Sequence, residues 1–176
     1  MSATGSGYDY SASILSPDGR VFQIEYAQKA VEKSGTAIGV RCKDGVVLGS
    51  EKQLISKMLV QGGNKRIQTV DEHTGIVCIA SFYQRQAMAG LAADARQIVN
   101  KGRSESESYR SFYGTEIPGR VLAERLAGHV HTYTLYWHTR PFGCAILIAN
   151  YDDSMGPQLY SIDPSGTNFV CRYHSH

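Results

Sequence analysis

The residues best placed for specific chemistry lie near the N-terminus of the chain. Tyr8 and Asp9 supply a phenol and a carboxylate side by side, and a polar turn follows at Ser16-Pro17-Asp18-Gly19. Pro17 fixes its own φ angle, and the side-chain oxygens of the turn can accept hydrogen bonds from the backbone amides that follow. We therefore expect an ordered N-terminal segment that works through hydrogen bonds, and not a frayed tail.

Other polar groups have spacings that suit neither a metal ion nor a phosphate. The glycine-rich stretch 62–66 lacks the spacing of a phosphate-binding loop. His129, His131 and His138 do not place two imidazoles at i,i+4 on one helix face, and the cysteines show no Cys-x-x-Cys spacing. We therefore expect no cofactor and no metal centre from these groups.

A helix must carry the segment after the turn. Apolar residues recur with a helical period from about residue 19 to residue 34, and Glu25 and Lys29 are spaced for an i,i+4 ion pair on the opposite arc. Phe22 falls among these charges. From the residues alone, Phe22 is either ordinary surface or a contact with another chain.

The rest of the chain predicts an α+β domain. Strands are expected at 36–42, 46–49, 66–70, 74–80, 145–149 and 159–162, and helices at about 88–99 and 118–137. Strands followed by two helices and further strands fit stacked layers rather than alternating βαβ units. The 176 residues and the net charge of +2 fit one domain with no nucleic-acid or membrane surface. Free cysteines and the lack of a leader or a long apolar run predict a soluble intracellular protein.

Several stretches together resemble one family. Tyr8-Asp9, the turn at 16–19 and the run Val21–Ala27 resemble the N-terminal signature of proteasome alpha subunits. Stretches at 90–96, 131–136, 140–144 and 158–166 resemble the same family in the same order, and their residues are most similar to those of the alpha type-3 group. The resemblance implies the four-layer αββα sandwich of the N-terminal-nucleophile hydrolases.

The resemblance also implies a function. It implies a noncatalytic alpha-ring subunit of the 20S proteasome, cytoplasmic and nuclear, which assembles with neighbouring alpha and beta subunits, gates the pore and docks activators or the regulatory particle in ubiquitin-dependent degradation. Phe22 then becomes a ring contact, and the activator pocket carries Arg66 beside Lys65, where many family members present a lysine. The residues that would hold the open gate are Tyr8, Asp9, Pro17 and Tyr26.

An enzyme is the main alternative that the resemblance raises. Catalytic siblings use an N-terminal threonine whose free amine activates its own hydroxyl, and Gly35-Thr36 resembles the junction at which they process themselves. Alignment of the turn at 43–45 places the nucleophile on Gly35, the aspartate position on Glu51 and the lysine position on Arg66. Gly35 has no reactive side chain, and an arginine stays protonated. We therefore expect no independent proteolytic activity, through Thr36 or otherwise.

Two departures from the family pattern complete the prediction. Residues 81–89 read as an insertion that either extends the following helix or bulges near Arg66, and the sequence changes character at residue 167. We expect a gating segment at 1–18, a partial alpha-subunit domain at 19–166 and a non-family tail at 167–176. Such a C-terminally truncated sandwich would expose apolar surface, and a regulatory or non-functional fragment outside the barrel is the third functional alternative.

Overall fold

The N-terminal part of the chain is a turn followed by one helix. The structure is a computed structural model that describes residues 7–51, 57–58, 60, 62, 65–80 and 89–175. Helix α1 spans Phe22–Glu32 and begins later than the sequence predicts, because the Ser16 hydroxyl accepts a hydrogen bond from the Arg20 backbone amide at 3.0 Å. Glu25 makes its close ion pair with Arg20 at 2.5 Å, and Lys29, the predicted partner, acts on Glu25 as a nearby positive charge that lowers its pKa.

The strands of the described residues form two antiparallel sheets. The smaller sheet has the order β2-β1-β8, and the larger one has the order β3-β4-β5-β6-β7. The strands are β1 Ala37–Arg41, β2 Val46–Ser50, β3 Ile67–Asp71, β4 Thr74–Ile79, β5 Ala145–Asp152, β6 Gly156–Ile162, β7 Asn168–Cys171 and β8 Tyr173–Ser175.

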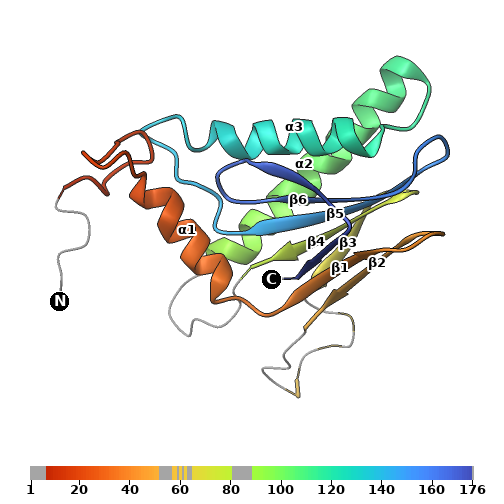
Figure 1. Cartoon of the computed structure of the whole chain (residues 1–176), viewed down its shortest axis with the longest axis horizontal. Helices are drawn as coiled ribbons and strands as arrows, with labels where there is room; N and C mark the ends of the chain where they lie inside the picture. The colour runs from red at the N-terminus through yellow and green to blue at the C-terminus, as the bar shows by residue number, and fades with distance from the viewer. Residues whose placement is uncertain are drawn as a thin grey trace.

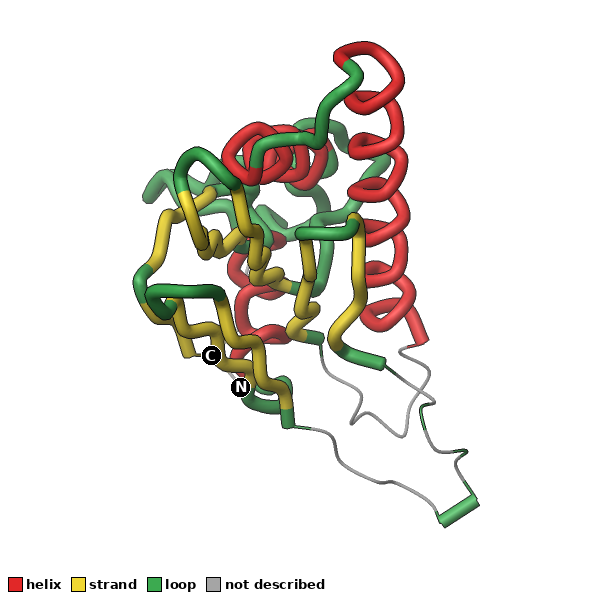
Figure 2. The backbone as a smooth tube through the Cα atoms, turned by 90° about the vertical axis from the view of Figure 1, so that its right-hand side faces the viewer, coloured by secondary structure: helices red, strands yellow, loops and turns green. Residues whose placement is uncertain are grey.

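Two helices cover one face of the larger sheet. Figure 1 shows α2 (Ala89–Tyr113) and α3 (Gly119–Thr132) above this sheet, the smaller sheet below it, and α1 at one end of the sandwich. Figure 2 shows the chain from the side, and in this view the strands of the two sheets lie apart from each other. The predicted α+β sandwich is confirmed. The described residues do not form the helical layer over the smaller sheet that a four-layer sandwich includes.

The apolar residues divide into two cores. One lies between the larger sheet and its helices, with Ile98, Leu122 and Leu126 fully buried against Ile146 and Ile148. The other lies between the two sheets, where side chains of β4, β5 and β6 meet the first strand and the end of α1. The buried carbon surface of these cores provides the main stabilisation of the fold.

Strand β1 turns its small residues inward. Ala37 and Gly39 face the second core, while Ile38 and Val40 are 47% and 39% exposed. A Cβ atom on Gly39 would lie 3.0 Å from a methyl carbon of Leu159. The alternation predicted for 36–42 is therefore present, with its larger apolar residues on the outer face.

The two helices differ from their predicted lengths. Residues 103–108, predicted as a helix end or a loop, lie inside α2, where Glu105 pairs with Lys101 at 2.7 Å and with Arg125 of α3 at 2.9 Å. Helix α3 ends at Thr132, so His138 lies outside it. The predicted insertion at 81–89 falls almost wholly outside the described residues, which resume at Ala89.

The C-terminal residues connect the two sheets. Strand β7 pairs with β6, and β8 pairs with β1 on the other side of Arg172. The Arg41 backbone amide donates to the Arg172 carbonyl at 2.9 Å. Residues 168–175 thus belong to both sheets of the sandwich.

Candidate functional site

Asp9 attaches the N-terminal segment to α1. The Tyr26 phenol donates to Asp9 Oδ2 at 3.3 Å, and the side-chain amide of Gln23 donates to the Asp9 carbonyl oxygen. Gln23 and Tyr26 are three residues apart, so they share one face of α1. Desolvation, with the nearby Asp9 carboxylate, raises the pKa of Tyr26, and the phenol therefore stays protonated and able to donate.

The other two predicted gate residues lie in more exposed positions. Tyr8 is 38% exposed, and within the described parts of the chain no hydrogen bond joins it to Asp9 or Tyr26. Pro17 is exposed in a turn that the Gly19 amide closes by donating to the Ser16 carbonyl at 2.9 Å. Of the four predicted residues, hydrogen bonding joins Asp9 and Tyr26.

Phe22 is half-buried at the start of α1. The Arg20 guanidinium carbon lies 5.0 Å from the centre of the Phe22 ring, which itself lies 6.4 Å from the Tyr26 ring. Arg20 also donates to both carboxylate oxygens of Glu25, and this hydrogen bonding lowers the pKa of Glu25. A cation and a second ring therefore hold Phe22 in one orientation, with part of its surface open.

Gly35, Glu51 and Arg66 come together as the sequence register predicts. A Cβ atom on Gly35 would lie 3.0 Å from Arg66 Nη1 and 3.5 Å from Glu51 Oε2. The Thr36 backbone amide donates to Glu51 Oε2 at 3.2 Å, and Arg66 is only 8% exposed. While the peptide bond between Gly35 and Thr36 is intact, the Thr36 nitrogen is an amide and cannot act as a base.

A cationic cavity of about 210 Å³ lies beside this group. Lys65 and Arg66 line it just before β3, and Arg96 lines it from α2. Cys78 also lines it, and burial raises the pKa of the Cys78 thiol to about 12, so this thiol is not a thiolate nucleophile at neutral pH. Three cationic side chains line the cavity, so it favours an anionic group.

Two stretches that carried the family resemblance meet in an ion pair whose carboxylate is buried and whose guanidinium is exposed. Asp94 lies in the stretch 90–96 and is 6% exposed, and Arg140 opens the stretch 140–144. The Arg140 guanidinium donates to both Asp94 oxygens at 2.7 and 2.8 Å, and the Gly143 amide donates to Asp94 Oδ2 at 3.1 Å. This pair holds α2 against the loop that enters β5.

Comparisons with known proteins match nearly the whole sequence of the chain. A family model for the N-terminal signature of the A-type proteasome subunits matches residues 8–30, and one described as "Proteasome subunit" matches residues 31–176. The chain belongs to the proteasome alpha-subunit family. The predicted family is thereby confirmed, and the match includes the strands β7 and β8.

Curated relatives carry the same family name. The alpha type-3 proteasome subunit of Arabidopsis thaliana is 53% identical over 169 residues, which span 96% of this chain and 64% of that protein. The alpha type-3 subunit of Acanthamoeba castellanii is 55% identical over 94% of this chain and 61% of its own length. The probable alpha type-7 subunit of Saccharomyces cerevisiae is 46% identical over 95% of this chain and 54% of its own length. This alpha subunit therefore spans less than two thirds of the length of these relatives.

Some residues of the alpha subunit's sites were missed from the sequence. Gln23 lies inside the N-terminal signature, but nothing in its type or position indicated that it would bind the Asp9 carbonyl. Arg96 ends the recognised stretch 90–96, and its distance along the chain from Lys65 hid their shared cavity.

No helix in the described residues is long and apolar enough to cross a bilayer.

Proposed function

We propose that this proteasome alpha subunit is a noncatalytic member of the 20S alpha ring, in the cytoplasm and the nucleus. Its role is ring assembly with neighbouring alpha and beta subunits, gating of the pore, and docking of activators or the regulatory particle in ubiquitin-dependent degradation. The observation that carries the proposal is the attachment of Asp9 to α1 through Tyr26 and Gln23. Because Asp9 is attached to α1, the N-terminal segment extends from the helix in a defined direction.

In this proposal residues 1–18 are the gating segment, and Tyr8, Asp9, Pro17 and Tyr26 hold it in the open gate. The Tyr26 hydroxyl and the Asp9 carboxylate supply the polar contact, and Pro17 supplies a rigid turn. Residues 19–166 are the main part of the ring-forming domain, and strands β7 and β8 within residues 167–176 complete its two sheets. The open part of Phe22 contacts a neighbouring alpha subunit.

The gating role is tested in reconstituted particles. Tyr26→Phe removes only the hydroxyl, and it is expected to change activator-stimulated hydrolysis of a fluorogenic peptide while particle assembly on a native gel stays the same. Tyr151→Phe is the matched control, because Tyr151 is an exposed tyrosine of the larger sheet. A chain that never enters particles would support the free-fragment alternative, and equal stimulation of both variants would remove the gating role.

The noncatalytic role rests on the group around Gly35. The position of the nucleophile holds a residue without a side chain, and Arg66 offers no lone pair to a proton. The chain is therefore expected to keep the peptide bond between Gly35 and Thr36. Intact-mass measurement of the mature protein tests this, because cleavage at that bond would expose Thr36 as an N-terminal nucleophile and support the hydrolase alternative.

The cationic cavity is the proposed docking site for an activator carboxylate. Lys65 and Arg66 are the predicted contacts, and Arg96 adds a third positive charge from α2. A guanidinium differs in geometry from the lysine of many family members, so we expect this subunit to anchor activators weakly. Arg66→Lys in assembled particles should raise activator affinity, and an unchanged affinity would contradict the proposal.

A further inference from the structure

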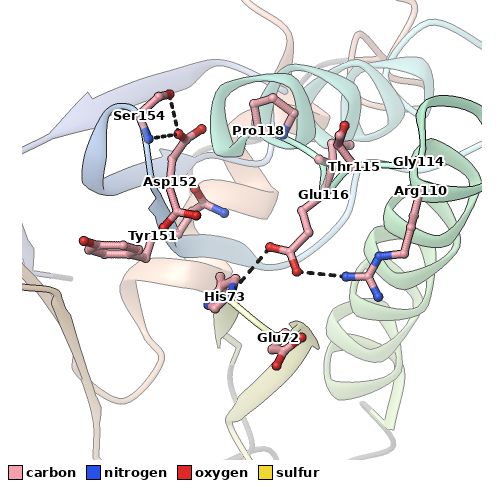
Figure 3. A pocket seen from close by; sticks show the side chains of 13 residues that line it. Glu72, His73, Arg110, Gly114, Thr115, Glu116, Pro118, Tyr151, Asp152 and Ser154 are labelled. Carbon is pink, nitrogen blue, oxygen red and sulfur yellow. Dashed lines mark hydrogen bonds and ion pairs between the residues drawn. The ribbon is translucent and has the colours of Figure 1, made fainter.

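A second cavity, of about 630 Å³, lies at the end of the sandwich opposite α1. The β3–β4 turn, the loop between α2 and α3, and the β5–β6 hairpin line it (Figure 3). Among its described lining residues, the carboxylates of Glu72, Glu116, Asp152 and Asp153 stand against a single permanent cation, Arg110. This cavity therefore favours a cationic ligand.

The charges of the cavity are already partly arranged by internal contacts. Arg110 donates to Asp71 at 2.8 Å and to Glu116 Oε1 at 3.1 Å. The Ser154 hydroxyl and amide donate to Asp152 Oδ1 at 2.5 and 2.8 Å, and these hydrogen bonds lower the pKa of Asp152. Glu116 thus has one oxygen bound by Arg110, and its second oxygen faces His73.

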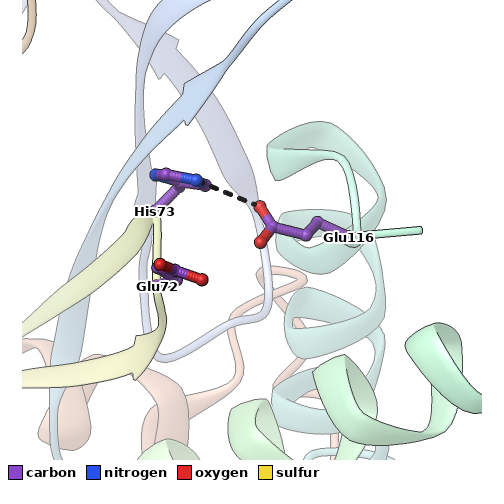
Figure 4. Close-up of side chains that lie close together, drawn as sticks. All are labelled: Glu72, His73 and Glu116. Carbon is purple, nitrogen blue, oxygen red and sulfur yellow. Dashed lines mark ion pairs between the residues drawn. The ribbon is translucent and has the colours of Figure 1, made fainter. Parts of the chain in front are cut away.

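Glu72, His73 and Glu116 bring three possible metal ligands together. One atom from each side chain lies within 4.8 Å of the other two, and His73 Nε2 lies 3.7 Å from Glu116 Oε2 (Figure 4). A zinc ion with bonds of about 2.1 Å holds neighbouring tetrahedral ligands roughly 3.4 Å apart. Since all three side chains are exposed, small rotations would bring their atoms to that spacing.

A buried amide forms part of the wall of the same cavity. Asn150 lines the cavity from β5 and is 4% exposed, and its amide nitrogen donates to Thr74 Oγ1 at 2.7 Å. In the described part of the chain its oxygen, Oδ1, is buried and has no hydrogen-bond partner. This oxygen lies against the start of α3, where a Cβ atom on Gly119 would be 2.7 Å from it.

We propose that Glu72, His73 and Glu116 bind one divalent transition-metal ion, with Zn²⁺ as the best match. One imidazole and two carboxylates suit Zn²⁺, and water completes a four-coordinate site. Mg²⁺ fits less well, because it prefers oxygen ligands alone. The ion would join the β3–β4 turn to the loop between α2 and α3, two segments that are far apart in the sequence.

The test is a titration of the complete, untagged chain with Zn²⁺ by calorimetry. One ion per chain is expected, and His73→Ala and Glu116→Gln should each weaken binding by at least about tenfold. His138→Ala is the control, because this histidine is exposed and lies outside the cavity. Circular dichroism verifies that each variant keeps its secondary structure.

Substitution with Co²⁺ gives a second measurement. The parent chain and His138→Ala should show the visible absorption of a four-coordinate Co²⁺ ion, and His73→Ala should lose it. Absence of saturable Zn²⁺ binding would overturn the proposal. Equal binding by His73→Ala and the parent chain, with loss only in His174→Asn, would also overturn it, because the ligands would then belong to the C-terminal strand.

Discussion

Asp94 is the buried charge that joins α2 to the loop before β5. Its two oxygens receive hydrogen bonds from Arg140 and from the Gly143 amide. Asp94→Ala would leave that amide without an acceptor and Arg140 without its partner. We expect a loss of about 2 to 3 kcal/mol in the free energy of unfolding, below the roughly 3 to 5 kcal/mol for breaking a fully buried pair, because the Arg140 side chain is 60% exposed.

Glu124→Ala is the matched control for this prediction. Glu124 pairs with Arg120 at 2.9 Å, but both side chains are more than half exposed. Such surface pairs contribute about 0 to 1 kcal/mol. Denaturant unfolding of the two variants measures both values, and equal losses would show that Asp94 is not the stronger contact.

At the residue scale, the sequence predicted contacts correctly where the chain could be aligned with the catalytic members of the superfamily. The turn at 43–45 fixed the alignment, and the structure indeed places Glu51 and Arg66 around Gly35. The pair between Asp94 and Arg140 was not predicted, because their pairing depends on how α2 packs against a distant loop. The family resemblance identified the two stretches that contain Asp94 and Arg140, but it did not indicate that these two residues form a pair.

Strand β1 packs so closely on the larger sheet that its inner face needs a glycine. Gly39→Val would push its side chain against Leu159 and Leu147, whose methyl carbons lie 3.0 to 3.4 Å from the position of a Cβ. Overpacking of this kind costs about 1 to 3 kcal/mol. We expect that loss in the free energy of unfolding, measured by denaturant titration.

The neighbouring strand supplies the control for Gly39. Gly49 in β2 has no atom within 4 Å of the position of its Cβ. Because a β-branched residue favours a strand, Gly49→Val should leave stability unchanged or raise it. A loss at Gly49 as large as that at Gly39 would mean that strand conformation, and not the contact between sheets, limits both positions.

Helix α3 carries a histidine whose protonation opposes folding. The His129 ring lies 5.2 Å from the Tyr133 ring and 5.8 Å from that of Phe142. Burial lowers the pKa of His129, Lys101 of α2 lowers it further, and Glu105 acts in the opposite direction. The unfolded chain therefore binds this proton at a higher pH than the folded chain does.

The free energy of unfolding should accordingly fall as pH drops through about 6.5, the ordinary pKa of histidine, and level off below the lower pKa of the folded state. His129→Leu should reduce that slope, as followed by thermal unfolding between about pH 7 and pH 5. His138→Ala, with its exposed ring, should keep the slope of the parent chain. A slope that survives in His129→Leu would assign the pH dependence to other groups.

At the element scale, the existence of strands and helices was easier to predict than their limits. The strand predicted at 74–80 is β4, and its apolar run is buried as expected. Helix α2 continues through the polar residues 103–108 because Lys101, Arg125 and Glu105 form ion pairs along its side. The end of α3 was overestimated, because Tyr133 continues the apolar spacing beyond the last helical residue, Thr132.

At the scale of the whole molecule, the sequence predicted the layers but not the way the last residues join them. The change of character at residue 167 indicated a tail, whereas strands β7 and β8 pair with different sheets. Such pairings bring together residues 38–40 and 173–175, and no local pattern of short strands shows a contact over that separation. The family match through residue 176 agrees with an integral position of these strands.

The outer face of the smaller sheet should cause the isolated chain to self-associate. Val40 lies directly opposite Val47 on one side and Tyr173 on the other, so their side chains form one row across three strands. Val47 is 62% exposed and Tyr173 is 80% exposed. Contiguous exposed apolar residues on a sheet promote association.

Val47→Lys and Tyr173→Lys should therefore lower the mass-average size measured by light scattering, whereas Met155→Lys, at an exposed hairpin residue of the larger sheet, should not. A parent chain that stays monomeric and unfolds in a sharp thermal transition would show that this face does not drive association.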